Sequence, residues 1–295
     1  MLSFEKLSLD DIESIRSYFS LAISRTCDNT VGVIFMWRDF FNTEFCVYNN
    51  TLIIKFKLDD DETAFLLPLG SDIDGCLDEM ESYCKAQNVP LTFFMVANEE
   101  ISFIKNKYQD IQIKRHKDWF DYLYRAEDLA AFAGRRYSGQ RNHINFFTRT
   151  YADFSFEEID EHNLSEAIDM YQSVISHIDK ESNLFDEDKK STIELLENYS
   201  QYNLFGGLLR AAGKVVAFSV GEIQRDTLFV HVERADNSYR GAYQMIVTHF
   251  SRHFAGDGVQ FINRGEDLGD EGLRTAKQAL HPVELIDKYT VVVNN

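Results

Sequence analysis

The chain has 295 residues and a formal net charge of −18, with 44 % hydrophobic and 14 % aromatic residues. This much apolar material excludes intrinsic disorder, and the length suits one large domain or two of about 150 residues. The acidic excess argues against nonspecific binding to DNA or to anionic lipid surfaces, because both carry negative charge.

Several patterns that are absent from the sequence indicate the cellular compartment of the protein. Its first residues contain no basic stretch followed by an apolar core, and no apolar run approaches the roughly 20 residues of a membrane span. The four cysteines form no CxxC pair, so they predict neither a zinc site nor a redox centre. We expect a cytoplasmic protein with no integral membrane segment and no bound metal.

The first half of the chain alternates strands and helices. Two β-rich runs flank Asn49-Asn50, a good hairpin turn, and later apolar residues recur at helical spacing. We expect strands at 44–48, 51–57 and 64–68, a helix at 73–87, a strand at 91–96, a helix at 98–107, and strands at 111–115 and 119–124.

The second half repeats this order. We expect strands at 204–211, 215–223 and 227–233, a helix at 239–254, a strand at 259–263, a helix at 271–280 and one or two strands at 283–293, preceded by helices near 138–151, 164–177 and 186–199. Both halves therefore follow β-β-β-α-β-α-β, the layout of N-acetyltransferase-type (GNAT) domains. The sequence predicts an α+β fold of two tandem GNAT domains, residues 1–128 and 129–295, with mostly antiparallel mixed sheets flanked by helices and the active site in the second domain.

A basic strip stands out against the acidic chain. Residues 129–152 contain no acidic side chain but four arginines, and Arg141 and Asn145 would share one face of a helix beginning at Ser138. One interpretation is a groove for the phosphates of tRNA or of a smaller donor. The other is a solvated face that pairs with acids elsewhere in the chain. The donor-binding candidates here are Arg135, Arg136, Arg141 and Asn145.

The end of the third strand of the second domain carries His231 and Glu233. Strand alternation places them on the same face, where either could accept a proton from an attacking amine. We predict Glu233 as general base with His231 assisting; the alternative is an ion pair of Glu233 with Arg234 or Arg240. The following turn, Arg240-Gly241, opens a helix whose free N–H groups could bind a pyrophosphate, or it is an ordinary tight turn.

Acids and glycines alternate in 263–277 ahead of two basic residues. This pattern suits either a helix cap or an acidic pocket for a substrate ammonium group, with Arg274 or Lys277 toward a phosphate or carboxylate. The substrate-binding candidates are Tyr243, Gln244, Asn263, Glu266, Asp267, Gly269, Arg274 and Lys277.

Four stretches carry a family resemblance: 137–147, 231–236, 239–244 and 263–277, the last followed by His281-Pro282. Together they resemble a soluble bacterial branch of the phosphatidylglycerol lysyltransferase C-terminal domain family, which is related to Fem-type aminoacyltransferases. The resemblance implies direct transfer of an aminoacyl group from aminoacyl-tRNA to an amine or hydroxyl of a lipid or small molecule, with no required cofactor. It also implies that Gly269, Arg274 and Lys277 help to form the aminoacyl pocket. The alternatives are an acyl-CoA-dependent N-acetyltransferase and a non-catalytic module that binds RNA or protein.

Overall fold

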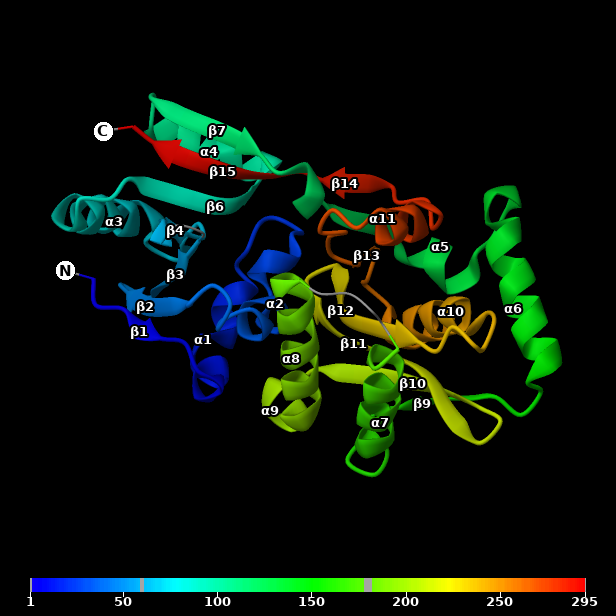
Figure 1. The fold of residues 1–295 in the computed structure, drawn as a ribbon. Helices are drawn as coiled ribbons and strands as arrows, with labels where there is room; N and C mark the ends of the chain where they lie inside the picture. Colours follow the sequence, from blue (N-terminus) through cyan, green and yellow to red (C-terminus); the bar gives the residue numbers. More distant parts are fainter. Residues whose placement is uncertain (1, 59–60, 178–181, 295) are drawn as a thin grey trace. The chain divides into compact units, whose positions relative to one another are not determined.

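The computed structural model describes residues 2–58, 61–177 and 182–294. The chain divides into two compact units, whose elements are labelled in Figure 1. Unit 1 comprises Met1–Asp121, Glu266–Gly269 and Leu285–Asn295, and unit 2 comprises Tyr122–Gly265 and Asp270–Glu284. The expected domains, 1–128 and 129–295, are contiguous in sequence, whereas unit 1 also takes in two short segments from the C-terminal half.

Unit 1 contains an eight-stranded sheet whose main path runs β1-β2-β3-β4-β6-β15-β7, with β5 paired to β3. Its strands are β1 (Glu5–Lys6), β2 (Glu44–Tyr48), β3 (Thr51–Lys57), β4 (Thr63–Phe65), β5 (Leu69–Gly70), β6 (Leu91–Ala97), β7 (Ile111–Arg115) and β15 (Lys288–Val293). Its α-helices are α1 (Ile12–Phe19), α2 (Val31–Met36), α3 (Ile73–Gln87) and α4 (Asn98–Lys107). Only β4 and β6 pair in parallel among these described strands.

Local chemistry explains several of these elements. Asn49 and Asn50 both have positive φ, 46° and 55°, as the tight hairpin between β2 and β3 requires. The Asp72 side chain accepts a hydrogen bond from the Gly75 N–H at 3.1 Å and so caps α3, which ends at Asn88 in the left-handed region. These elements begin and end where the sequence predicted them.

Unit 2 is built on a seven-stranded sheet in the order β14-β8-β13-β12-β11-β10-β9. Its strands are β8 (Asp121–Arg125), β9 (Ser155–Glu158), β10 (Phe205–Ala211), β11 (Lys214–Gln224), β12 (Thr227–Ala235), β13 (Phe261–Asn263) and β14 (Glu284–Ile286). Its α-helices are α5 (Ala126–Ala131), α6 (Ser138–Thr150), α7 (Leu164–Ile175), α8 (Asn183–Glu197), α9 (Tyr199–Tyr202), α10 (Ala242–Phe254) and α11 (Glu271–Gln278). Strands β12 and β13 pair in parallel.

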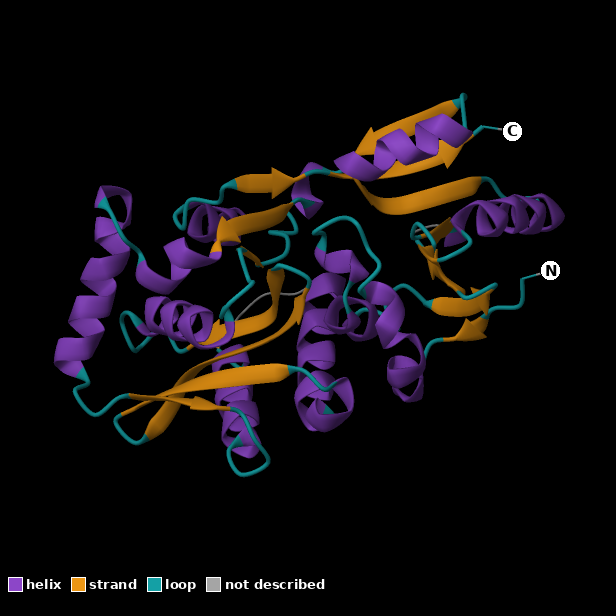
Figure 2. Ribbon diagram, turned by 180° about the vertical axis from the view of Figure 1, so that it is seen from behind, coloured by secondary structure: helices purple, strands orange, loops and turns teal. Residues whose placement is uncertain are grey.

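Each sheet includes one strand from the other half of the sequence. Strand β15 lies between β6 and β7, and β8 lies between β13 and β14. The expected α+β architecture is confirmed, with two mostly antiparallel sheets flanked by helices (Figure 2). In the part of the chain that the structure describes, no helix is long and apolar enough to cross a membrane.

Different helices cover the two faces of the unit 2 sheet. A Cβ added at Gly221 would lie 3.5 Å from Phe250 of α10. The ring of Phe218, three positions earlier on β11, instead lies 6.1 Å from that of Tyr171 of α7. Because successive side chains of a strand alternate, α10 covers the face of Ser219 and Gly221, and α7 covers the face of Phe218.

Candidate functional site

The candidate site in unit 2 lies where β12 and β13 stop pairing. Their parallel pairing covers only Thr227–Phe229 and Phe261–Asn263. Just beyond it, the register with β11 steps from Val230 to Val232, which leaves His231 as the extra residue of a β-bulge. A bulge bends its strand and increases the local twist. Glu233 and Arg264 lie on β12 and after β13, beyond the residues at which the two strands pair.

Glu233 and Arg264 form a buried ion pair, with side chains 6 % and 4 % exposed. Arg264 Nη2 donates hydrogen bonds both to Glu233 Oε1 and to the hydroxyl of Tyr243 on α10. The Ser219 hydroxyl donates to the second oxygen of Glu233 at 3.4 Å. The guanidinium is thus fixed through one of its three nitrogens.

The other two nitrogens of Arg264, Nε and Nη1, are buried and find no hydrogen-bond partner among the described residues. Its Cζ lies 5.3 Å from the ring centroid of Tyr243 and 5.9 Å from that of Tyr124, within cation–π range. The Lys277 ammonium donates to the Arg264 carbonyl at 2.6 Å and supports the backbone there. An unsatisfied buried donor costs about 1–3 kcal/mol, so these N–H groups are well placed for a ligand that accepts hydrogen bonds.

The environment also shifts the acid–base properties of the site. Burial raises the pKa of Glu233, and the attraction of Arg264 opposes that rise. Burial likewise raises the pKa of Tyr243, so its hydroxyl remains neutral at physiological pH. The site therefore combines one cation with free donors, one carboxylate and one neutral phenol.

Strict alternation along β12 predicted that His231 and Glu233 lie on the same face of the sheet. In the structure they do not. Ser219 bonds Glu233, whereas Glu222 bonds His231 with 2.8 Å between Glu222 Oε1 and His231 Nε2. Ser219 and Glu222 are three residues apart on β11, so their side chains point to opposite faces. The bulge at His231 breaks the alternation of β12, and the two predicted catalytic residues are separated by the sheet.

The expected partners of Glu233 are also engaged elsewhere. Arg234 pairs with Asp188 of α8 at 2.6 Å, and the Cζ of Arg240 lies 4.7 Å from the centroid of the Phe146 ring. The residue that does pair with Glu233, Arg264, was not among the predicted site residues. Its only sequence signal was its position between Asn263 and Gly265 in the glycine-rich segment.

The substrate-binding candidates are divided by the fold. Tyr243 and Lys277 contact Arg264, and Gln244 follows Tyr243 on α10. The buried Asn263 accepts a hydrogen bond from the Gly265 N–H at 2.7 Å, which supports the turn. Asp270, next to the candidates, caps α11, the helix that carries Arg274, by accepting from the Leu273 N–H at 2.8 Å. The remaining candidates, Glu266, Asp267 and Gly269, belong to unit 1.

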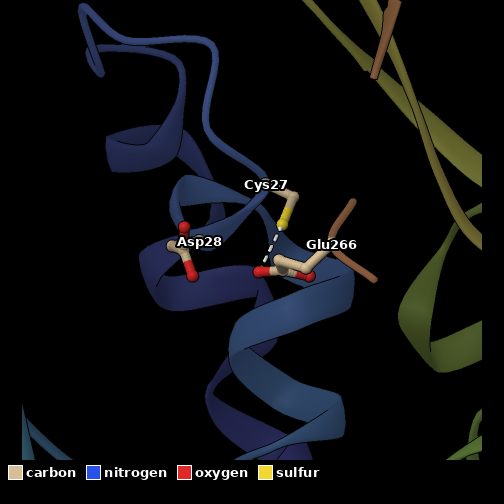
Figure 3. A group of neighbouring side chains, drawn as sticks. All are labelled: Cys27, Asp28 and Glu266. Carbon is tan, nitrogen blue, oxygen red and sulfur yellow. Dashed lines mark hydrogen bonds between the residues drawn. The ribbon is translucent and has the colours of Figure 1, made fainter. Parts of the chain in front are cut away.

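Glu266 takes part in a buried cluster of unit 1. The ammonium of Lys288, whose side chain is 0 % exposed, lies 2.6 Å from Asp28 and Glu266 and 2.8 Å from Asp121. The Cys27 thiol points at Glu266, as Figure 3 shows, with 3.4 Å between Sγ and Oε1. Burial raises the pKa of Asp28 to about 7.

Three members of this cluster, Cys27, Asp28 and Glu266, offer ligand atoms within 4.8 Å of one another, close enough to share a metal ion. The Lys288 ammonium already supplies a positive charge among these acids. We therefore interpret the cluster as a buried ion-pair centre that joins four chain segments of unit 1.

The arginines of the basic strip have local roles. Arg136 pairs with Asp128 at 2.7 Å. Arg141 donates to the carbonyl oxygens of Phe132 and Gly134, and so fixes the turn that precedes α6. Asn145 lies exposed on the same helix, and Arg135 is exposed in the 3₁₀ turn before it. Arg135 is thus the strip's clearest candidate for contact with a donor.

Packing accounts for the glycine at the start of α10. Gly241 has a φ of 95°, and a Cβ there would lie 2.4 Å from the carbonyl oxygen of His143 in α6. The approach of α6 therefore requires glycine whether or not a phosphate binds. The turn remains a candidate for donor binding, but the presence of glycine there is no evidence for a donor-binding site.

Comparisons with known proteins give the chain its context. Residues 19–292 match the family model described as "Phosphatidylglycerol lysyltransferase, C-terminal". The chain is 24 % identical over 200 residues to an uncharacterised protein of Mycoplasmoides gallisepticum, covering 66 % of this chain. It spans 62 % of the length of that relative.

Solved structures share the fold. A protein of unknown function from Bacteroides thetaiotaomicron is 29 % identical, with a TM-score of 0.92 and 100 % of both chains covered. L-PGS from Bacillus licheniformis is 13 % identical, with a TM-score of 0.65 and coverage of 96 % of this chain and 92 % of the other. FemX, 8 % identical, has a TM-score of 0.61 over 100 % of this chain and 98 % of its own. These likenesses agree with the expected tandem GNAT fold.

Proposed function

Because the chain belongs to the family defined by the C-terminal region of phosphatidylglycerol lysyltransferase, we propose that it transfers an aminoacyl group from aminoacyl-tRNA to an amine or hydroxyl acceptor. The observation that supports this proposal most is Arg264, a buried guanidinium with two free nitrogens where β12 and β13 separate. Reaction at an ester carbonyl places negative charge on its oxygen, which a fixed N–H donor stabilises.

In this proposal the roles of the site residues follow from their contacts. Arg264 directs a free N–H at the ester carbonyl oxygen, while Glu233 and Tyr243 hold the guanidinium in place. The acceptor attacks the carbonyl carbon, the bond to the ribose oxygen breaks, and that oxygen gains the proton lost by the acceptor. The reaction occurs by direct attack with no covalent enzyme intermediate, in a cytoplasmic protein.

Hydroxylamine tests the donor side without knowledge of the acceptor. Wild type should accelerate formation of amino acid hydroxamate from at least one member of an aminoacyl-tRNA panel. Arg264→Gln should lower kcat by about 10²–10³-fold, with a much smaller change in KM. Arg264→Lys keeps the charge but not the fork of donors, and should recover only part of the activity.

The control is Arg210→Gln, since Arg210 also pairs with carboxylates, Glu157 and Glu166, but on β10. It should retain full activity. Removing one partner of a buried ion pair costs about 3–5 kcal/mol, so urea unfolding must show that Arg264→Gln is folded under assay conditions. Transfer of an acetyl group from acetyl-CoA, with no transfer from any aminoacyl-tRNA, would overturn the proposal.

A further inference from the structure

The face of the unit 2 sheet opposite Glu233 holds a second polar group that the proposed function does not yet use. The His231 side chain is 1 % exposed, and its Nε2 lies 2.8 Å from Oε1 of Glu222, which is itself 13 % exposed. Its other nitrogen, Nδ1, is buried and has no hydrogen-bond partner within the described chain.

The α7 and α8 side also carries the hydroxyls of Tyr171 and Thr192, which interact with each other and, through Tyr171, with Arg234. The Tyr171 ring lies 5.9 Å from the guanidinium carbon of Arg234. Thr192 follows Asp188, the partner of Arg234, by one turn of α8. Native structures leave few buried polar atoms unpaired, so the bare Nδ1 of His231 requires an explanation.

The hydrogen bond from Glu222 determines which nitrogen of His231 can act as a base. A carboxylate accepts from Nε2–H, so it stabilises the tautomer that carries its proton on Nε2. That tautomer leaves a lone pair on the unpartnered Nδ1. A carboxylate that orients a histidine in this way is the arrangement used to activate nucleophiles by general-base catalysis.

Glu233 is less suited to this task. One of its oxygens is bonded to Arg264 and the other to Ser219. Protonating Glu233 would leave the buried charge of Arg264 without its counter-ion, which is costly. His231 can accept a proton without breaking an ion pair, and its imidazolium would gain a full ionic interaction with Glu222.

We infer that His231 is the general base that activates the acceptor, with Glu222 as its positioning residue; this inference rests on the transfer proposed above. His231 Nδ1 removes the proton from an acceptor O–H or N–H as that atom forms its bond to the ester carbonyl carbon. The ester C–O bond then breaks, and the proton passes from Nδ1 to the departing ribose oxygen. The reacting carbonyl then lies between β12 and β13, beyond Phe229 and Asn263 where their pairing stops, so that Arg264 reaches it from the α10 side and His231 from the α7 side.

The test compares two nucleophiles in one variant. Hydroxylamine is uncharged at neutral pH and strongly nucleophilic, so it needs little help from a base. His231→Asn should lower transfer to glycerol, ethanolamine or phosphatidylglycerol vesicles, whichever wild type uses best, by about 10²-fold or more. Transfer to hydroxylamine should change less than about threefold. Equal loss with both nucleophiles, or no loss with either, would overturn the role of His231.

A matched control is His253→Asn, because His253 forms the same kind of contact, 2.6 Å between its Nε2 and Glu158, at an exposed position. This control should keep both activities. If wild type transfers nothing to hydroxylamine, the proposed function fails, and that outcome is separate from a failure of the His231 variant.

A measurement without substrate tests Glu222. Nitrogen-15 NMR of the folded wild type at neutral pH should show His231 protonated on Nε2 with Nδ1 bare. Glu222→Gln should weaken this preference and lower transfer to the base-dependent acceptor about tenfold, with hydroxylamine transfer retained. A wild-type His231 carrying its proton on Nδ1 would contradict the inference even if no acceptor had been found.

Discussion

The Lys288 cluster of unit 1 leads to a measurable dependence of stability on pH. It contains three carboxylates and one ammonium within 2.8 Å of them, so it carries excess negative charge when every acid is ionised. Asp28 relieves that excess by taking up a proton, since burial raises its pKa to about 7. We predict that Asp28→Asn removes this titration while its amide oxygen can still accept a hydrogen bond from Lys288.

The magnitude follows from proton linkage. A group whose pKa is higher in the folded state stabilises the fold fully below its unfolded pKa, and this stabilisation is lost as the pH rises through the folded pKa. With an unfolded value of about 3.9, the window for Asp28 runs from about pH 4 to 7. One proton at about 1.4 kcal/mol per pH unit gives a loss of about 2.5 kcal/mol between pH 5 and pH 8.

The assay is urea unfolding of wild type and Asp28→Asn at pH 5 and pH 8. Asp28→Asn should gain about 2.5 kcal/mol relative to wild type on going from pH 5 to pH 8. The control is Asp61→Asn, which removes an exposed acid of the same unit and should show no such gain. If the difference between wild type and Asp28→Asn is the same at both pH values, Asp28 remains ionised throughout, and attraction to Lys288 outweighs burial.

Three further predictions concern Lys288, Gly241 and Arg135. Lys288→Met should destabilise the protein by about 3–5 kcal/mol at pH 8, because the buried acids lose their counter-ion. A loss of less than about 1 kcal/mol in urea unfolding would contradict the burial of this charge. Gly241→Ala should lower the free energy of unfolding by about 2–4 kcal/mol, because the new Cβ would meet the His143 carbonyl oxygen at a residue with positive φ. Gly213→Ala is the control: Gly213 also has positive φ but has open space around it, so this substitution should cost only about 1 kcal/mol. Arg135→Glu should weaken tRNA binding at low salt without changing stability. Arg141→Glu should also lower the melting temperature, because it loses the hydrogen bonds to the carbonyl oxygens of Phe132 and Gly134. Unchanged tRNA affinity in Arg135→Glu would exclude the strip as a donor contact.

The sequence by itself determined the local elements and the fold class. Strand alternation, helical spacing and the paired asparagines gave the bounds of β2, β3, α3 and α4 correctly, since these depend on interactions between near neighbours in the chain. The repeated order of elements in the two halves likewise led to the α+β architecture with two sheets.

Only the tertiary structure decided which segments share a sheet and which charges meet. The order of elements along the sequence does not show that β8 joins the sheet of unit 2 and β15 the sheet of unit 1. Hydrogen bonds between strands do not depend on how far apart the strands lie in sequence. The same holds for Arg264 meeting Glu233 and for Lys288 meeting Asp28. The bulge at His231 comes from the register between β11 and β12, a relation between two strands that the alternation within one strand does not contain. Alternation along one strand therefore predicted that Glu233 and His231 share a face, and only the folded chain places them on opposite faces of the sheet.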